Sequence, residues 1–120
     1  MNRIMNLWFE TARMDHTLIV RLKGELDSNT AGYLRGELER ELADWNIHHL
    51  ILNFTELTFM DSTGLGVILG RYKQLKQRDG ELVICAISAT IDKMFRLAGI
   101  YKLIAIKASE EEALQTVGVM

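Results

Sequence analysis

The sequence lacks several features that would place it in a specialised class of protein. It has no proline, one cysteine among 120 residues, and no linker or internal repeat, so neither a disulfide scaffold nor a string of tethered domains is expected. Its longest apolar runs, such as residues 82–87, are far shorter than a membrane-spanning helix. No charged-then-apolar leader precedes the first expected strand, so the cytoplasm is the expected location.

The sequence also lacks an excess of positive charge. Fourteen Lys and Arg residues against sixteen Asp and Glu residues give a net charge of −2, which argues against a nucleic-acid partner because phosphate backbones are bound by basic surfaces. The remaining composition is that of an ordinary globular protein, and we expect residues 1–120 to form one domain around one core. Cys85 lies inside an apolar run and is expected to be buried there.

Hydrophobic patterning in the first half of the chain predicts a hairpin followed by a helix. Strands are expected over residues 7–13 and 16–23, with a turn at Met14 and Asp15 and a break at residues 24–27. Residues 27–30 offer four successive helix caps. The helix that follows presents its apolar side chains as one stripe: Leu34, Leu38, Leu42 and Trp45.

The second half of the chain alternates strands with helices. Strands are expected over residues 47–54, 81–87 and 101–106. Three helices are expected: one over residues 64–78, one that begins after a cap at Ser88 or Thr90, and one that begins with a capping box at residues 109–112. The helix near residue 90 is expected to turn four apolar side chains inward and to end at Gly99: Ile91, Met94, Phe95 and Ala98. This order predicts an α/β fold, a mostly parallel sheet with an N-terminal antiparallel hairpin strand and about four helices.

Residues 59–72, FMDSTGLGVILGRY, form a loop with two adjacent hydroxyl groups that leads at once into a helix. Helical spacing predicts one buried face, made of Leu65, Ile68, Leu69, Tyr72 and Leu75. The opposite face is predicted to be exposed and consists of Thr63, Gly66, Val67, Gly70 and Gln74. Two glycines on an exposed helix face cost roughly 1 kcal/mol each relative to alanine. We interpret this face as one that another molecule approaches closely.

The common catalytic and metal-binding patterns are absent from the sequence. The serine nucleophile elbow needs glycine where Met60 stands, two residues before Ser62, and a histidine after the serine, whereas all three histidines precede it. The adjacent His48 and His49 have no cysteine or carboxylate at ligand spacing, and the glycine turn after Thr63 carries no P-loop lysine. We therefore expect no enzyme, no metal and no cofactor.

Two interpretations of the hydroxyl groups stay open at this point. Ser62 or Thr63 could simply cap the helix, which is worth about 1 kcal/mol, and spacing alone favours this. Alternatively, Ser62 could be a phosphorylation site. A phosphate would add roughly −1.5 to −2 charges, which a helix N-terminus tolerates. Beside Asp61, and Asp27 if the two loops meet, that charge would oppose an acidic or tightly fitted partner.

Residues 24–27, GELD, followed by residues 59–72 resemble the anti-sigma-factor antagonists of the STAS-domain family. The likeness extends from about residue 7 to the C-terminus and is greatest to the sporulation branch that acts in the sigma-F switch. The resemblance implies that the unphosphorylated protein binds an anti-sigma factor, itself a serine kinase, and releases the sporulation sigma factor. Phosphorylation of Ser62 by that kinase would inactivate the protein, and a serine phosphatase would restore it.

The resemblance and the exposed helix face together predict the partner-binding residues. Asp27 matches the acidic residue that contacts the partner, and the remainder follow the central loop: Asp61, Ser62, Thr63, Leu65, Gly66, Val67 and Gly70. Thr63 departs from a second serine common in the family, which leaves it open as a minor acceptor. The expected state is a monomer without a membrane partner. The alternatives are a STAS module of another stress-response network and a STAS domain that binds a small ligand or nucleotide.

Overall fold

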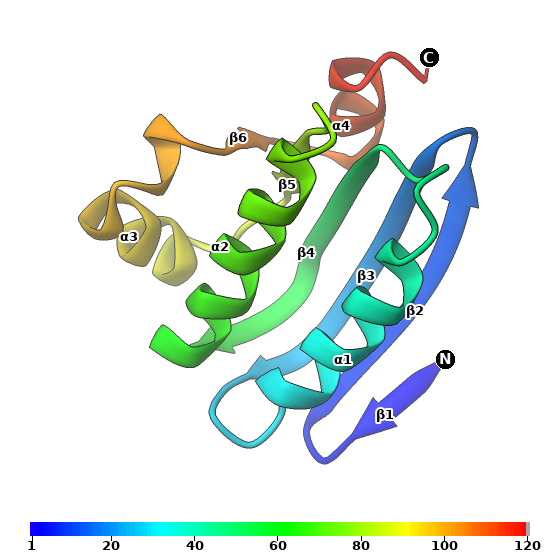
Figure 1. Ribbon diagram of the computed structural model, residues 1–120. Coiled ribbons are helices and arrows are strands. Elements are labelled where there is room, and N and C mark those ends of the chain that lie inside the picture. The colour runs from blue at the N-terminus through cyan, green and yellow to red at the C-terminus, as the bar shows by residue number, and fades with distance from the viewer. Residues whose placement is uncertain (120) are drawn as a thin grey trace.

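The computed structural model describes residues 1–119 and arranges its strands in one sheet that follows the order of the chain (Figure 1). The strands of this described part are β1 (Asn2–Ile4), β2 (Leu7–Met14), β3 (Thr17–Leu26), β4 (His49–Met60), β5 (Leu82–Cys85) and β6 (Ala105–Lys107). Strands β1 to β3 are antiparallel, whereas β3 to β6 are parallel. This arrangement confirms the predicted mostly parallel α/β sheet with an antiparallel N-terminal hairpin.

Helices α1 (Ala31–Leu42), α2 (Ser62–Lys76) and α3 (Ala89–Ala98) pack on the same face of the sheet. Strands β3 to β6 follow one another across the sheet in chain order. Because strand–helix–strand crossovers are right-handed, the helices that connect these strands all lie on one face of the sheet. Leu18, Val20 and Leu22 of β3 face these helices, as their alternation predicts. The short helix α4 (Glu110–Thr116) packs on the other face, against Ile19 and Ile51.

The burial of Cys85 and the absence of a membrane-spanning helix from residues 1–119 were both expected from the sequence. Cys85 is fully buried beneath α4, and this burial raises the pKa of its thiol to about 11, which confirms its place in the core. Among the helices of residues 1–119, none combines the length and the apolar character needed to cross a membrane.

The structure corrects several predicted elements. Trp45 lies beyond the end of α1 and is 62% exposed, with the guanidinium of Arg78 4.3 Å from its ring centroid, so the buried stripe of α1 ends at Leu42. The expected strand over residues 101–106 is a 3₁₀ turn, Ile100–Lys102, followed by the short β6. Ala98 is exposed rather than buried. Gly99 does end α3 in the left-handed conformation, and Ser88 caps its start.

The largest correction concerns residues 24–26, which continue β3 instead of breaking it. Gly24 has a φ of +103° and lies between two irregularities in the β3–β4 register, so the strand bends here while its pairing resumes. A Cβ atom at Gly24 would be 2.0 Å from the carbonyl oxygen of Asn6, which excludes any other residue. The continuation matters because it carries β3 to the same edge of the sheet as the end of β4.

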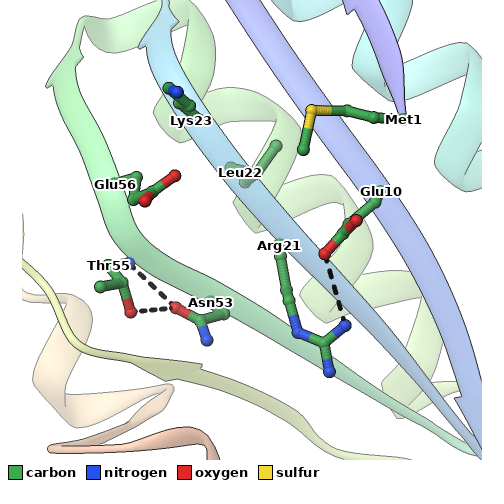
Figure 2. Close-up of a pocket in the computed structure, with 8 residues that line it drawn as sticks. All are labelled: Met1, Glu10, Arg21, Leu22, Lys23, Asn53, Thr55 and Glu56. Carbon is green, nitrogen blue, oxygen red and sulfur yellow. Dashed lines mark hydrogen bonds and ion pairs between the residues drawn. The ribbon is translucent and has the colours of Figure 1, made fainter.

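A polar network fastens α4 to the sheet. Arg21 of β3 donates from Nε and Nη2 to the two carboxylate oxygens of Glu110, at 2.8 and 2.9 Å, and Asn53 donates to Glu110 at 3.2 Å. Figure 2 shows Arg21 also directed towards Glu10 of β2, at 3.5 Å, beside a hollow of about 260 Å³. The sequence suggested only a helix cap for Glu110; its ion pair with Arg21 depends on tertiary structure.

Replacing Glu110 by glutamine is expected to lower the free energy of unfolding by about 1 kcal/mol at neutral pH, because a charge-assisted pair becomes a neutral one at a partly exposed site. Hydrogen bonds from Arg21, and less strongly from Asn53, hold the pKa of Glu110 below its ordinary 4.5. The stabilisation is therefore complete above that value and is lost as the pH falls through the lower folded pKa.

Urea denaturation at neutral and acidic pH measures this effect. Glu111→Gln is the matched control, since Glu111 is exposed in the same helical turn. Equal losses in the two variants would show that the helix dipole, and not the Arg21 pair, accounts for the change.

Candidate functional site

Two loops that are 34 residues apart in sequence meet at the carboxyl edge of the sheet. Leu26 and Met60, the last residues of β3 and β4, are register partners in parallel strands, so residues 27 and 61 leave the sheet side by side. The backbone N–H of Ser28 donates to Oδ2 of Asp61 at 3.0 Å, and the N–H of Asp61 donates to the carbonyl of Leu26 at 3.2 Å. Figure 1 shows the β3–α1 loop and the start of α2 at this same edge. Asp27 and Ser62 therefore belong to one surface, because the two loops, whose contact the sequence left open, do meet.

Asp61 is the N-cap of α2. Its Oδ1 accepts hydrogen bonds from the N–H groups of Thr63, at 2.9 Å, and Gly64, at 3.2 Å, while its Oδ2 accepts the bond from Ser28. A carboxylate at this position also interacts favourably with the helix dipole. The interpretation that Ser62 or Thr63 caps the helix is therefore wrong: the acidic side chain that precedes them does so.

Ser62 is the first residue of α2 and is exposed. Within residues 1–119 its hydroxyl makes no hydrogen bond to another protein group, because Asp61 already satisfies the first free N–H groups of the helix. The Ser62 side chain is thus not needed to form or to anchor α2. Its hydroxyl is free for chemistry at the positive end of a 15-residue helix.

Asp27 organises its own loop in the same way. Its Oδ1 accepts hydrogen bonds from the backbone of Asn29 at 2.9 Å and of Thr30 at 3.2 Å, and the hydroxyl of Thr30 lies 3.2 Å away. Asp27 is half-buried, whereas Ser28 and Asn29 are exposed. The edge around Ser62 therefore carries two carboxylates, both held by backbone N–H groups.

The buried stripe of α2 differs from the predicted one. It consists of residues one turn apart that face both the sheet and α1: Gly64, Val67, Ile68, Arg71 and Leu75. Val67 is only 6% exposed, so its prediction as part of an exposed docking face is wrong. Leu65, Leu69 and Tyr72 are half-buried at the margin of the core. The stripe was obscured because Arg71, a charged residue, occupies a buried position.

What remains of the exposed face is a strip formed by Thr63, Gly66 and Gly70, flanked by Leu65. Gly66 is exposed and Gly70 half-exposed, and a Cβ atom at either would meet no atom within 4 Å. At Gly64, by contrast, a Cβ atom would come within 2.9 Å of Leu26 and Met60. Gly64 is required by packing inside the protein, whereas Gly66 and Gly70 leave bare backbone for which the fold itself gives no reason.

Alanine substitutions are expected to separate these two kinds of glycine. Gly64→Ala should lower the free energy of unfolding by roughly 1–3 kcal/mol, since the new methyl group overlaps two strand ends. Gly66→Ala should raise it by roughly 0.5–1 kcal/mol, because alanine is the better helix former and meets nothing. Chemical denaturation of the two variants measures both. A loss of stability in Gly66→Ala would mean that Gly66, too, is needed by the fold.

The shape of this edge suits a protein partner better than a small molecule. Five hollows on the surface of residues 1–119, including the one in Figure 2, lie elsewhere, and none is lined by Asp27, Asp61 or Ser62. In the same described part of the chain no three His, Cys, Asp or Glu side chains converge as metal ligands. Small-molecule sites are generally concave, whereas protein interfaces need not be.

Phe59 is an exposed aromatic residue next to this edge of the sheet that was not singled out from the sequence. It is 44% exposed and lies two residues before Asp61, between the buried Leu57 and Met60. Aromatic side chains are enriched at protein interfaces. The available signal was an aromatic residue at a strand end where its neighbours already supply the core.

Comparison with known proteins gives a consistent result. The family model described as STAS domain matches residues 9–113. An anti-sigma F factor antagonist from Paenibacillus polymyxa is 38% identical over 92% of this chain and 94% of its own length. An anti-sigma-B factor antagonist from Listeria monocytogenes is 37% identical over 90% and 95%.

Solved structures agree with the sequence matches. The anti-sigma factor antagonist SpoIIAA in its unphosphorylated form has a TM-score of 0.77 and 30% identity, covering 94% of this chain and all of that one. The Bacillus cell fate determinant SpoIIAA in the phosphorylated form has a TM-score of 0.75 and 32% identity, covering 92% and 99%.

Proposed function

The chain belongs to the STAS-domain family and is an anti-sigma factor antagonist, and on this premise we propose that phosphorylation of Ser62 switches it off. In the unphosphorylated state the edge formed by Asp27, Ser62 and the Gly66–Gly70 strip binds an anti-sigma factor that is also a serine kinase. Binding releases the sigma factor held by that anti-sigma factor. The protein is a regulator and a substrate, with no catalysis of its own.

One observation carries the proposal: Asp61, and not Ser62, caps α2. A kinase can modify an exposed hydroxyl without removing a hydrogen bond from the fold. The phosphate would stand at the positive end of α2, where an anion is tolerated, beside the carboxylates of Asp61 and Asp27. The dianionic group would alter the charge and shape of the docking edge, and partner binding would be lost by repulsion and steric mismatch.

A phosphorylated relative supports this reading. A member of the family with the same fold exists in both unphosphorylated and phosphorylated forms. By position, Ser62 is the acceptor in this chain, and a serine phosphatase would return the protein to its binding state. Such a cycle with a cellular kinase and sigma factor would take place in the cytoplasm.

The sigma factor involved is proposed to be the sporulation factor sigma-F, on the strength of the central segment, residues 59–72. The competing proposal is a sigma-B-type stress network, because relatives named as anti-sigma-B factor antagonists are nearly as similar. Incubation with ATP and either a sigma-F or a sigma-B anti-sigma factor, followed by intact-mass spectrometry and peptide mapping, distinguishes them. One phosphate on Ser62 with only the sigma-F partner supports the proposal, and modification with only the sigma-B partner supports the rival.

A nucleotide-binding role is the remaining alternative. The β4–α2 turn carries no lysine to hold phosphates, and no hollow described above includes it. Titration with ATP or GTP in the absence of a partner tests this role. Saturable micromolar binding would favour it over the phosphorylation switch.

A further inference from the structure

A second polar surface lies between α1 and α2, at the end of α2 remote from Ser62. A groove of about 490 Å³ runs along the last turns of α1 and α2 and the residues that follow each helix. Its lining includes three cations and a single carboxylate: Arg71, Lys73, Arg78 and Glu39. The centre of this groove is about nine residues, or roughly 13 Å of helix, from the proposed phosphorylation site.

Arg71 is the unusual residue of this groove. Only 10% of its side chain is exposed, yet within residues 1–119 its Nε and Nη1 atoms have no hydrogen-bond acceptor. Its Nη2 is 3.5 Å from Oε1 of Glu39, at the outer limit of a hydrogen bond. The contrast with Arg21, which bonds Glu110 through two nitrogens at 2.8 and 2.9 Å, shows how incompletely Arg71 is satisfied. A buried guanidinium stays charged, and leaving it without full pairing is costly.

The surroundings of Arg71 have the same incomplete pairing. The side-chain oxygen of Gln74 and the Nε of Arg78 are buried without partners in the described chain. Arg78 is fixed by stacking on Trp45, at 4.3 Å, and by donating to the carbonyl of Ile47, at 3.0 Å. Burial lowers the pKa of Arg71, which reflects the cost of keeping its charge there.

We propose that this groove binds an oxyanion, a phosphate or carboxylate group, which Arg71 recognises and for which Glu39 is a weak internal substitute. Glu39 is 53% exposed and its contact with Arg71 is long, so a ligand oxyanion can displace it at little cost. Arg78 and Lys73 supply further positive charge. The guanidinium group suits this task because it presents several N–H donors in a fixed plane to a planar or tetrahedral anion.

The test is an amide-resolved NMR titration of the full chain with sodium phosphate, with sodium succinate, and with sodium chloride at matched ionic strength. Phosphate or succinate should cause saturable shifts at Gly70, Gln74 and the Trp45 indole N–H, and chloride should not. The preferred anion identifies whether the natural source carries a phosphate or a carboxylate. Arg71→Met should weaken binding about tenfold or more, as expected for loss of a charge-assisted hydrogen bond.

Two further variants keep the test decisive. Glu39→Gln removes the internal competitor and should tighten binding several-fold without disturbing the core. Arg40→Met is the matched control, since Arg40 lies exposed on α1 and pairs with Glu37. If Arg71→Met is unfolded by circular dichroism, Glu39→Gln decides: unchanged affinity overturns the proposal.

Other results would also overturn it. Equal shifts with chloride, or equal losses in Arg40→Met and Arg71→Met, would indicate charge screening only. Shifts confined to residues 62–64 would place the anion at the start of α2 instead. Ser62→Ala should leave the titration unchanged, so this site and the phosphorylation switch are tested separately.

Discussion

Ser62→Ala is expected to abolish phosphorylation by the partner kinase while leaving the fold and partner binding intact, giving a constitutively active antagonist. The reason is structural: Ser62 makes no hydrogen bond within residues 1–119, and its neighbour Asp61 caps α2. The stability change should be within about 0.5 kcal/mol, as for an exposed surface position. Intact-mass spectrometry after incubation with ATP and the anti-sigma factor measures the first effect, and a pull-down measures the second.

Thr63→Ala is the control for the neighbouring hydroxyl and should still gain one phosphate. Phosphate on Thr63 in the Ser62→Ala protein would instead make Thr63 the second acceptor. Ser62→Asp should weaken partner binding incompletely, because one carboxylate carries less charge than a phosphate. A folded Ser62→Ala protein that no longer bound the anti-sigma factor would refute the switch, since the hydroxyl would then be needed for docking itself.

Gly66→Arg is expected to abolish partner binding without harming the fold. Because no atom lies within 4 Å of a Cβ atom built at Gly66, the new side chain extends into solvent and α2 keeps its packing. The same extension places a long charged group on the strip that we propose the partner approaches closely. Binding should fall on the order of a hundredfold, as expected if the steric overlap costs about 3 kcal/mol.

The chain offers a closely matched control in Gly36→Arg. Gly36 is an exposed glycine inside α1, also with nothing within 4 Å of an added Cβ atom. Both variants should give native circular dichroism, and only Gly66→Arg should fail in the pull-down. Normal binding by Gly66→Arg would show that the bare backbone of α2 is not a docking surface.

The sequence predicts most of the fold because its local signals and its packing agree. Alternating apolar residues in β3, the caps at Ser88 and Ser109, and the left-handed Gly99 all lie where expected. The failures have physical causes. Gly24 bends β3 instead of ending it, β1 is too short and exposed to have an apolar pattern, and Trp45 is held by Arg78 rather than by the core.

The sequence named candidate residues for the site but not how they are arranged. Ser62 and Asp27 could be named from sequence, yet their proximity depends on the pairing of Leu26 with Met60, which requires β3 to continue past its glycine bend. The stripe of α2 was misjudged because hydrophobic periodicity has no place for a buried arginine. Once Arg71 is counted as an inward residue, Val67 follows inward by helical spacing, and Thr63 remains outside with the two glycines.

Because Asp61 holds the structure and Ser62 does not, phosphorylation need not disturb the fold. The Asp61 side chain joins two loops and caps a helix, whereas the Ser62 side chain makes no contact that the fold needs. A phosphate on Ser62 could therefore be added and removed without any step of unfolding or refolding. The two states of such a protein would differ in the charge and shape of one surface edge and not in the fold. The rate of its response would then be set by the kinase and the phosphatase and not by a conformational change.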